Sequence, residues 1–122
     1  MSRRVVITGL GLISPLGLTL ADNLNFLIKG ISGIDHISSF ECSSWRVKIA
    51  AEVKNFDPSC LPGKKKSIKL MNRDSQLAVA ATHLALEDSK LNRDEIDPCT
   101  IGIAFGSFGI QYTLEDAYIV TH

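Results

Sequence analysis

The chain opens with a β-branched run and a glycine-rich turn, which together favour a buried strand at the start of an α/β fold. Residues 4–8 read Arg-Val-Val-Ile-Thr, a run typical of a parallel strand that is covered on both faces. Glycines at 9, 11 and 17 then permit tight turns, and Pro15 disfavours helical backbone at Ser14. We therefore expect a strand, a tight turn, and a helix that begins only near Leu20.

Helical spacing of apolar residues predicts two further elements before the next strand. A helix is expected from about Leu20 to Lys29, with Gly30 ending it. A longer helix, free of glycine and proline, is expected from about Ser67 to Ser89. Its predicted buried face consists of Leu77, Ala81 and Leu84. Residues 32–62 are predicted to form a long, irregular connecting segment with a short strand at 47–50.

The apolar residues 101–105, Ile-Gly-Ile-Ala-Phe, read as a second buried strand, and residues 110–120 again have helical spacing. Strands joined through helices imply parallel pairing with a right-handed crossover, so residues 5–8 and 101–105 should lie side by side. Two strands alone leave apolar faces and edges exposed. We therefore predict that residues 1–122 form an incomplete α/β domain, with mainly parallel buried strands and covering helices.

Composition narrows the class of protein. Lys plus Arg and Asp plus Glu each number 13, so the balance is unlike that of a basic nucleic-acid-binding module. No run approaches the roughly 18 apolar residues of a membrane helix. The cysteines form no CxxC pair and have no metal-ligand spacing with histidine: Cys42, Cys60 and Cys99. These features predict a cytoplasmic protein without nucleic-acid or membrane partners.

The turn after the first strand also permits a dinucleotide-binding interpretation. Gly9 and Gly11 match the first two glycines of the GxGxxG fingerprint, in which a pyrophosphate meets a helix N-terminus. Ser14 replaces the third glycine, however, and Pro15 delays the helix. The other interpretation of these residues is a turn that only shapes the fold.

Four blocks in order carry a resemblance to β-ketoacyl-acyl-carrier-protein synthases of the elongating type. Residues 3–17 resemble the opening strand and turn of that family, and residues 27–34 its first helix end and following loop. Residues 69–89, with Met71-Asn72-Arg73 and the later alanines, are similar to its long alanine-rich helix. Residues 101–107 are similar to its next core strand. Failure of the two strand segments to pair would count against this resemblance.

The resemblance implies part of the N-terminal half of a thiolase-like fold. The implied reaction is a decarboxylative Claisen condensation, in which a cysteine at a helix N-terminus holds the acyl group as a thioester. Two histidines help malonyl-acyl-carrier-protein lose carbon dioxide, and hydrogen-bond donors stabilise the oxyanion. The resemblance implies no metal or other cofactor. It implies a homodimer, or a heterodimer with a synthase-like partner, for the full-length protein.

Catalytic residues of the family lie further along its chain than residue 122, so we expect none here. Cys42-Ser43 resembles the cysteine–serine run of the family's active site, but it follows Phe40-Glu41 in the irregular region. We also expect no catalytic or metal role for the histidines: His36, His83 and His122. The glycine-rich turn after Ser107 lies near the family's acyl pocket and dimer interface. Phe108 is therefore a candidate for either location.

A basic cluster is the main candidate binding site. It consists of five cations within ten residues: Lys64, Lys65, Lys66, Lys69 and Arg73. The simplest interpretation is a solvated helix face. The resemblance favours docking of the acidic acyl carrier protein, because complementary charge speeds encounter.

Three functions therefore remain in competition. The leading hypothesis is an N-terminal fragment of an acyltransferase, a 3-oxoacyl-acyl-carrier-protein synthase of fatty-acid or polyketide synthesis, inactive by itself. The second is a non-catalytic, synthase-like partner subunit of the chain-length-factor type. The third is a dinucleotide-binding α/β domain.

Overall fold

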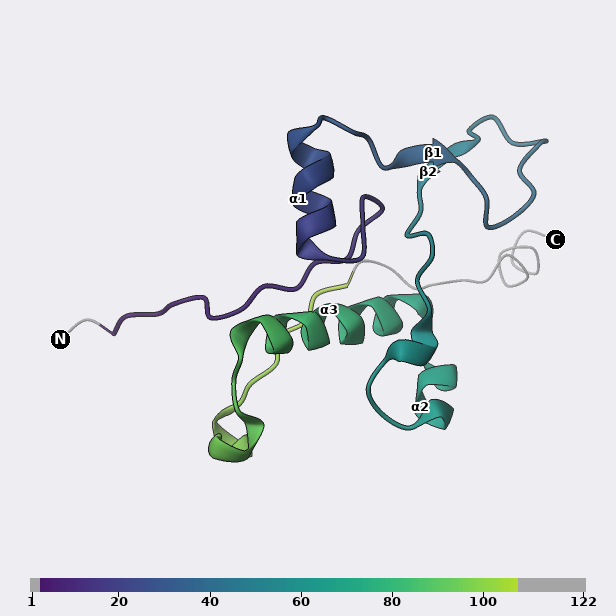
Figure 1. Ribbon diagram of the computed structural model, residues 1–122. Helices are drawn as coiled ribbons and strands as arrows, with labels where there is room; N and C mark the ends of the chain where they lie inside the picture. Colours follow the sequence, from purple (N-terminus) through teal and green to yellow (C-terminus); the bar gives the residue numbers. More distant parts are fainter. Residues whose placement is uncertain (1–2, 108–122) are drawn as a thin grey trace. The chain divides into compact units, whose positions relative to one another are not determined.

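The computed structural model describes residues 3–107 of the 122-residue chain. The chain divides into two compact units, residues 1–91 and 92–122, and each is described by itself. The first contains α1, β1, β2, a 3-10 helix η1, α2 and α3, and the second contains the short 3-10 helices η2 and η3 (Figure 1). Among the described residues, no helix is both long and apolar enough to cross a membrane.

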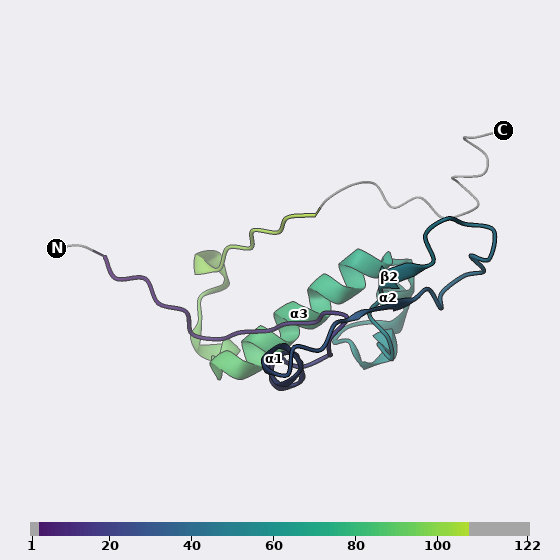
Figure 2. The same ribbon diagram turned by 90° about the horizontal axis from the view of Figure 1, so that it is seen from above.

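The opening segment, residues 3–13, runs without regular secondary structure and lies against α3 (Arg73–Ser89) in its second half (Figure 2). The missing side chains of its two glycines make this approach possible. A Cβ on Gly9 would collide with the Ala85 carbonyl oxygen and with Ser89. The Leu10 amide also donates a 2.8 Å hydrogen bond to the Asp88 carboxylate. Val5 and Ile7 are 94% and 81% exposed, so the expected buried strand is absent from the described structure.

A buried asparagine joins the following turn to α1 (Leu20–Ile28). Ser14 and Gly17 exchange two 3.0 Å backbone hydrogen bonds across the turn. Asn23, only 1% exposed, donates to the carbonyl oxygens of Gly17 at 2.9 Å and Thr19 at 2.7 Å, and it also contacts the Ser14 hydroxyl. The turn and the helix therefore share one polar anchor.

The limits of α1 follow from its caps. The Thr19 hydroxyl accepts a hydrogen bond from the Asp22 amide, as a helix N-cap does. At the other end Gly30 has a φ of +66°, and the amides of Gly30 and Ile31 bond to the carbonyls of Leu27 and Phe26. The predicted helix and its glycine stop are confirmed.

The connecting segment, residues 32–62, contains an antiparallel pair of strands, β1 (Ile34–His36) and β2 (Ile49–Ala51). Ile34 pairs with Ala51 and His36 with Ile49. This pair is the only sheet in the described part of the chain. The short strand predicted at 47–50 is thus present, but it begins two residues later and ends one residue later.

The predicted helix from about Ser67 to Ser89 is divided in two: α2 (Lys65–Leu70) and α3. Met71 and Asn72 adopt extended backbone, and the Asn72 side chain caps α3 by accepting from the Ser75 amide at 2.8 Å. The single-helix prediction is wrong because an internal N-cap ends one helix and starts the next without any glycine or proline.

The core of the first unit lies where α2, α3 and η1 (Pro58–Cys60) meet. Its buried members are Leu61, Ile68 and Ala80, with Ile13, Phe56 and Val79 packed against them. The side of α3 that faces this core differs from the predicted one. Leu77, Ala81 and Leu84 are half-buried, and Ala80 is the buried residue of that helix.

The second unit contains η2 (Arg93–Glu95), η3 (Pro98–Thr100) and residues 101–107 without regular structure. Asp97 caps η3 by accepting from the Cys99 amide at 2.9 Å. Ile103 is 85% exposed. The predicted parallel pairing of residues 5–8 with 101–105 is not confirmed, since neither segment belongs to a sheet in the described structure. The helix predicted at 110–120 lies outside the described residues.

Candidate functional site

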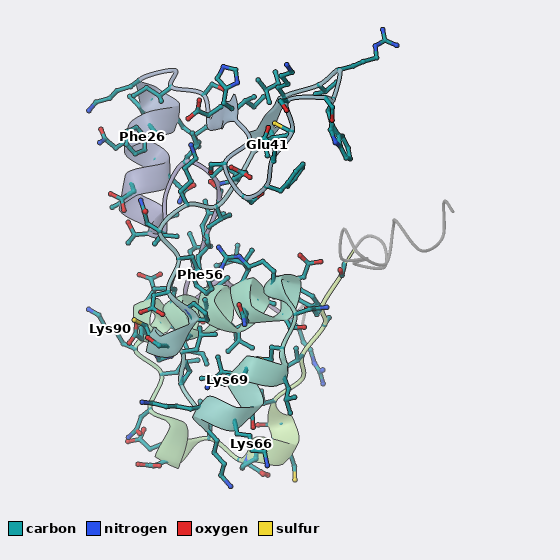
Figure 3. All side chains as sticks on the ribbon, turned by 90° about the vertical axis from the view of Figure 1, so that its right-hand side faces the viewer. Phe26, Glu41, Phe56, Lys66, Lys69 and Lys90 are labelled. Carbon is teal, nitrogen blue, oxygen red and sulfur yellow. The ribbon has the colours of Figure 1, made fainter. Side chains whose placement is uncertain are left out.

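Four of the five cations in the basic cluster lie on or beside α2 (Figure 3). Lys64 is the residue before the first turn, Lys65 and Lys66 lie in that turn, and Lys69 lies in the last turn. All four are exposed. The first turn contains no acidic residue, so its lysines oppose the helix dipole without local compensation. This charge pattern therefore does not stabilise α2, and its presence needs another explanation.

The α2 lysines have no acidic partner within the described part of the chain. The ion pair found there joins Lys54 to Asp35 at 2.7 Å, and the His83 imidazole lies 3.4 Å from the Glu87 carboxylate. Because these lysines are also exposed, four ammonium groups face solvent within six residues. Such a surface can attract an acidic partner by long-range electrostatics.

Arg73 does not share the position of these lysines. The break before α3 places Arg73 in a different helix from Lys66 and Lys69. Its guanidinium lies 4.7 Å from the centre of the Phe56 ring and donates to the Val53 carbonyl oxygen at 3.0 Å. Arg73 therefore holds the segment between β2 and η1 against the start of α3, and it does not continue the row of α2 lysines along one helix.

A hollow of about 230 Å³ lies beside α2. Its lining includes two of the lysines, the buried side of the helix and polar groups from η1 and α3: Asp57, Ser59, Lys65, Ile68, Lys69 and Gln76. Asp57 accepts hydrogen bonds from the Ser59 hydroxyl and amide, which hold the pKa of its carboxyl below the usual range. Asp57 stays ionised at neutral pH and is the one acidic group of this lining.

A second polar cluster supports the loop after β1. Glu52 accepts hydrogen bonds from the amides and hydroxyls of both Ser38 and Ser39, at 2.5–3.1 Å. These bonds, led by that of the Ser39 hydroxyl, lower the pKa of Glu52 to about 2. Every described hydrogen bond that this carboxylate accepts comes from the loop, so the role of Glu52 is to hold the loop in place. Sequence reasoning missed it, because nothing local links residues 38 and 52.

The cysteines and histidines do not form a reacting pair in the described part of the chain. Cys42 is half-buried in the loop between the strands, and Cys60 and Cys99 are exposed within η1 and η3. Cys60 and His83 line one apolar hollow of about 250 Å³, but no hydrogen bond joins them there. Within the described residues no cluster of three or more His, Cys, Asp or Glu could hold a metal ion.

The dinucleotide interpretation fails on the surroundings of its glycines. The open sides of Gly9 and Gly11 are filled by the backbone of α3 at Ala81 and Ala85. No helix begins directly after the turn, since α1 starts at Leu20. A pyrophosphate would have neither the space nor the helix N-terminus that the fingerprint provides.

Comparison with known proteins decides the family. The model of the β-ketoacyl synthase N-terminal domain matches residues 2–121. The chain belongs to the β-ketoacyl synthase family. It is 44% identical over 105 residues to 3-oxoacyl-[acyl-carrier-protein] synthase 2 of Coxiella burnetii, covering 86% of this chain and 25% of the relative. It is 39% identical over 121 residues to the granaticin polyketide putative β-ketoacyl synthase 1 of Streptomyces violaceoruber, covering 98% and 28%.

A solved structure agrees with this β-ketoacyl synthase assignment. The chain superposes on the ishigamide ketosynthase/chain length factor with a TM-score of 0.69 and 33% identity, covering 79% of this chain and 24% of the other. The fold is therefore of the thiolase-like ketosynthase type, although the two expected strands are unpaired in the described residues. The chain spans about a quarter of the length of the curated relatives. Phe108 lies outside the described residues.

Proposed function

We propose that the chain is the N-terminal part of a β-ketoacyl-acyl-carrier-protein synthase and supplies a docking surface for acyl carrier protein through Lys64, Lys65, Lys66 and Lys69. The observation that carries the docking role is the run of exposed ammonium groups on α2, without an acidic partner in the described structure. A chain of zero formal net charge that concentrates cations here can orient an acidic partner. The name of the Coxiella burnetii relative, which refers to acyl carrier protein, supports the same choice.

The proposed reaction of the parent protein is decarboxylative Claisen condensation, in fatty-acid or polyketide synthesis. Relatives of both kinds support the general class without separating the two pathways. Residues 1–122 are proposed to form one partial synthase domain that is inactive alone, because its described cysteines are not paired with a histidine. Three free cysteines suit a reducing cytoplasm.

The apolar segments 5–8 and 101–105 are proposed as core strands of the complete fold. Val5, Ile7 and Ile103 are each at least 81% exposed, and β-branched side chains of this kind normally lie between covering layers. Pairing with strands from elsewhere in a complete synthase would bury them. The parent is proposed to act as a homodimer or as a heterodimer with a synthase-like partner.

Charge reversal tests the docking role. The double variant Lys65→Glu/Lys69→Glu should bind acyl carrier protein at least about tenfold more weakly than the parent chain, because attraction becomes repulsion at the contact. Binding of the parent chain should also weaken as salt is raised, since exposed charges are screened. Isothermal titration with purified carrier protein, at two ionic strengths, measures both effects.

A matched control separates local docking from net charge. Lys48→Glu/Lys90→Glu changes the net charge by the same amount at two exposed lysines outside α2. Its affinity for acyl carrier protein should stay within about twofold of the parent chain. Equal losses in the two double variants would mean that α2 is not the docking surface.

A chain-length-factor-type subunit remains the second candidate, because the superposed solved structure is that of the ishigamide ketosynthase/chain length factor. The source gene downstream of the His122 codon distinguishes the two. A strand of small residues ending in cysteine would indicate the enzyme. A synthase-like sequence that continues without that cysteine would indicate the partner subunit.

A further inference from the structure

The short basic helix α2 is not stable without contacts from other parts of the chain. It has six residues, and isolated helices of that length are unstable in water. Lys64 provides no side-chain cap at its start, and the lysines of its first turn oppose the dipole. The arrangement of the proposed docking lysines must therefore be fixed by contacts from outside the helix.

Two contacts from outside α2 meet at its last turn. Ile68 is 6% exposed and belongs to the core, which holds one side of the helix. Gln76, from the first turns of α3, donates its Nε2 amide to the carbonyl oxygens of Ile68 at 3.3 Å and Met71 at 3.2 Å. These carbonyls lie at the C-terminal end of α2, where few intrahelical partners remain. The Ile68 carbonyl also accepts from the Met71 amide at 3.2 Å.

The Gln76 amide therefore does for α2 what a cap residue does for an ordinary helix, but it does so from the neighbouring helix. Asn72 caps the start of α3 within the same elbow, so the two amide side chains fix both sides of the bend. Gln76 also lines the hollow that Lys65 and Lys69 share. Because Gln76 is neutral, its long-range effect on a charged partner acts through the placement of α2.

We propose that Gln76 is a positioning residue of the docking surface, which sets the angle between α2 and α3 and thereby the direction in which Lys65 and Lys69 face an acidic partner. This inference rests on the proposed docking of acyl carrier protein. It assigns to Gln76 an effect on affinity that is separate from its effect on folding.

Gln76→Met tests the proposal, because methionine keeps the length of the side chain and loses the donor amide. Measured well below the unfolding midpoint, the variant should bind acyl carrier protein about three- to tenfold more weakly. Amides of α2 should also exchange faster with solvent than in the parent chain. Thr82→Val is the matched control, since it removes a 2.8 Å side-chain bond to the Ala78 carbonyl within α3 and leaves α2 untouched.

A double-mutant cycle distinguishes positioning from a general loss of stability. In a Lys65→Gln/Lys69→Gln background, Gln76→Met should cause a clearly smaller loss of affinity, because two of the four charges that it positions are gone. Two results would overturn the role of Gln76 and leave the docking proposal standing. One is an equal loss of affinity on Gln76→Met in both backgrounds. The other is unchanged affinity of Gln76→Met while the lysine variant binds more weakly. Unchanged affinity of the lysine variant itself overturns the docking proposal and this inference together.

Discussion

Replacing Gly11 with alanine should release the N-terminal segment from α3. A Cβ at residue 11 would collide with the Ala81 carbonyl oxygen and the Ala85 amide nitrogen, both of them helix backbone atoms. A side chain could rotate away, but these atoms are held by the hydrogen bonds of α3. Overpacking of this kind costs about 1–3 kcal/mol. Because the Leu10–Asp88 bond is the one described hydrogen bond from residues 3–13 to α3, we expect residues 9–11 to detach while α3 stays intact.

Hydrogen exchange at the Leu10 amide measures this release. The amide should lose about ten- to hundredfold of its protection in Gly11→Ala, the range that corresponds to the overpacking cost. Gly102→Ala is the control, since a Cβ at that residue meets nothing within 4 Å. Unchanged protection of Leu10 in Gly11→Ala would contradict the close packing of this segment on α3.

Asn23→Ala should lower the free energy of unfolding of the first unit by about 2–4 kcal/mol. The variant removes both amide hydrogen bonds and the contact with the Ser14 hydroxyl at a buried position. The Gly17 carbonyl and the Ser14 hydroxyl then keep only their bonds within the turn, from the amides of Ser14 and Leu16. The variant also leaves a small cavity beside the turn. Urea unfolding followed by circular dichroism gives the change.

Asn25→Ala provides the comparison for Asn23→Ala, because it makes the same substitution on an exposed face of the same helix. Alanine favours helix over asparagine by a few tenths of a kcal/mol, so Asn25→Ala should be neutral or slightly stabilising. Similar destabilisation by both variants would show that Asn23 contributes helix propensity only and does not anchor the turn.

Local sequence signals predicted the elements whose ends are set by nearby residues. The limits of α1 follow from Thr19 and Gly30, which act within one turn of the helix. The break between α2 and α3 also had a local signal, since Asn72 is a favoured N-cap residue and Asp74 adds an acid to the first turn. Continuous apolar spacing across residues 67–89 concealed it.

Long-range partners explain what the sequence could not predict. The basic residues of α2 were identifiable as a charge cluster, but the engagement of Arg73 depends on Val53 and Phe56, which precede it by 17–20 residues. Gln76 and Asn23 are ordinary polar residues in the sequence. Their roles arise only when carbonyl groups of other segments are brought to their amides.

The most direct test of the account is a condensation assay on the folded chain with acyl- and malonyl-acyl-carrier protein, combined with carrier-protein binding. The account predicts binding that depends on Lys65 and Lys69, and no β-ketoacyl product. Product formation that is lost on replacing Cys42, Cys60 or Cys99 with alanine would contradict it, because one of these cysteines would then be the nucleophile.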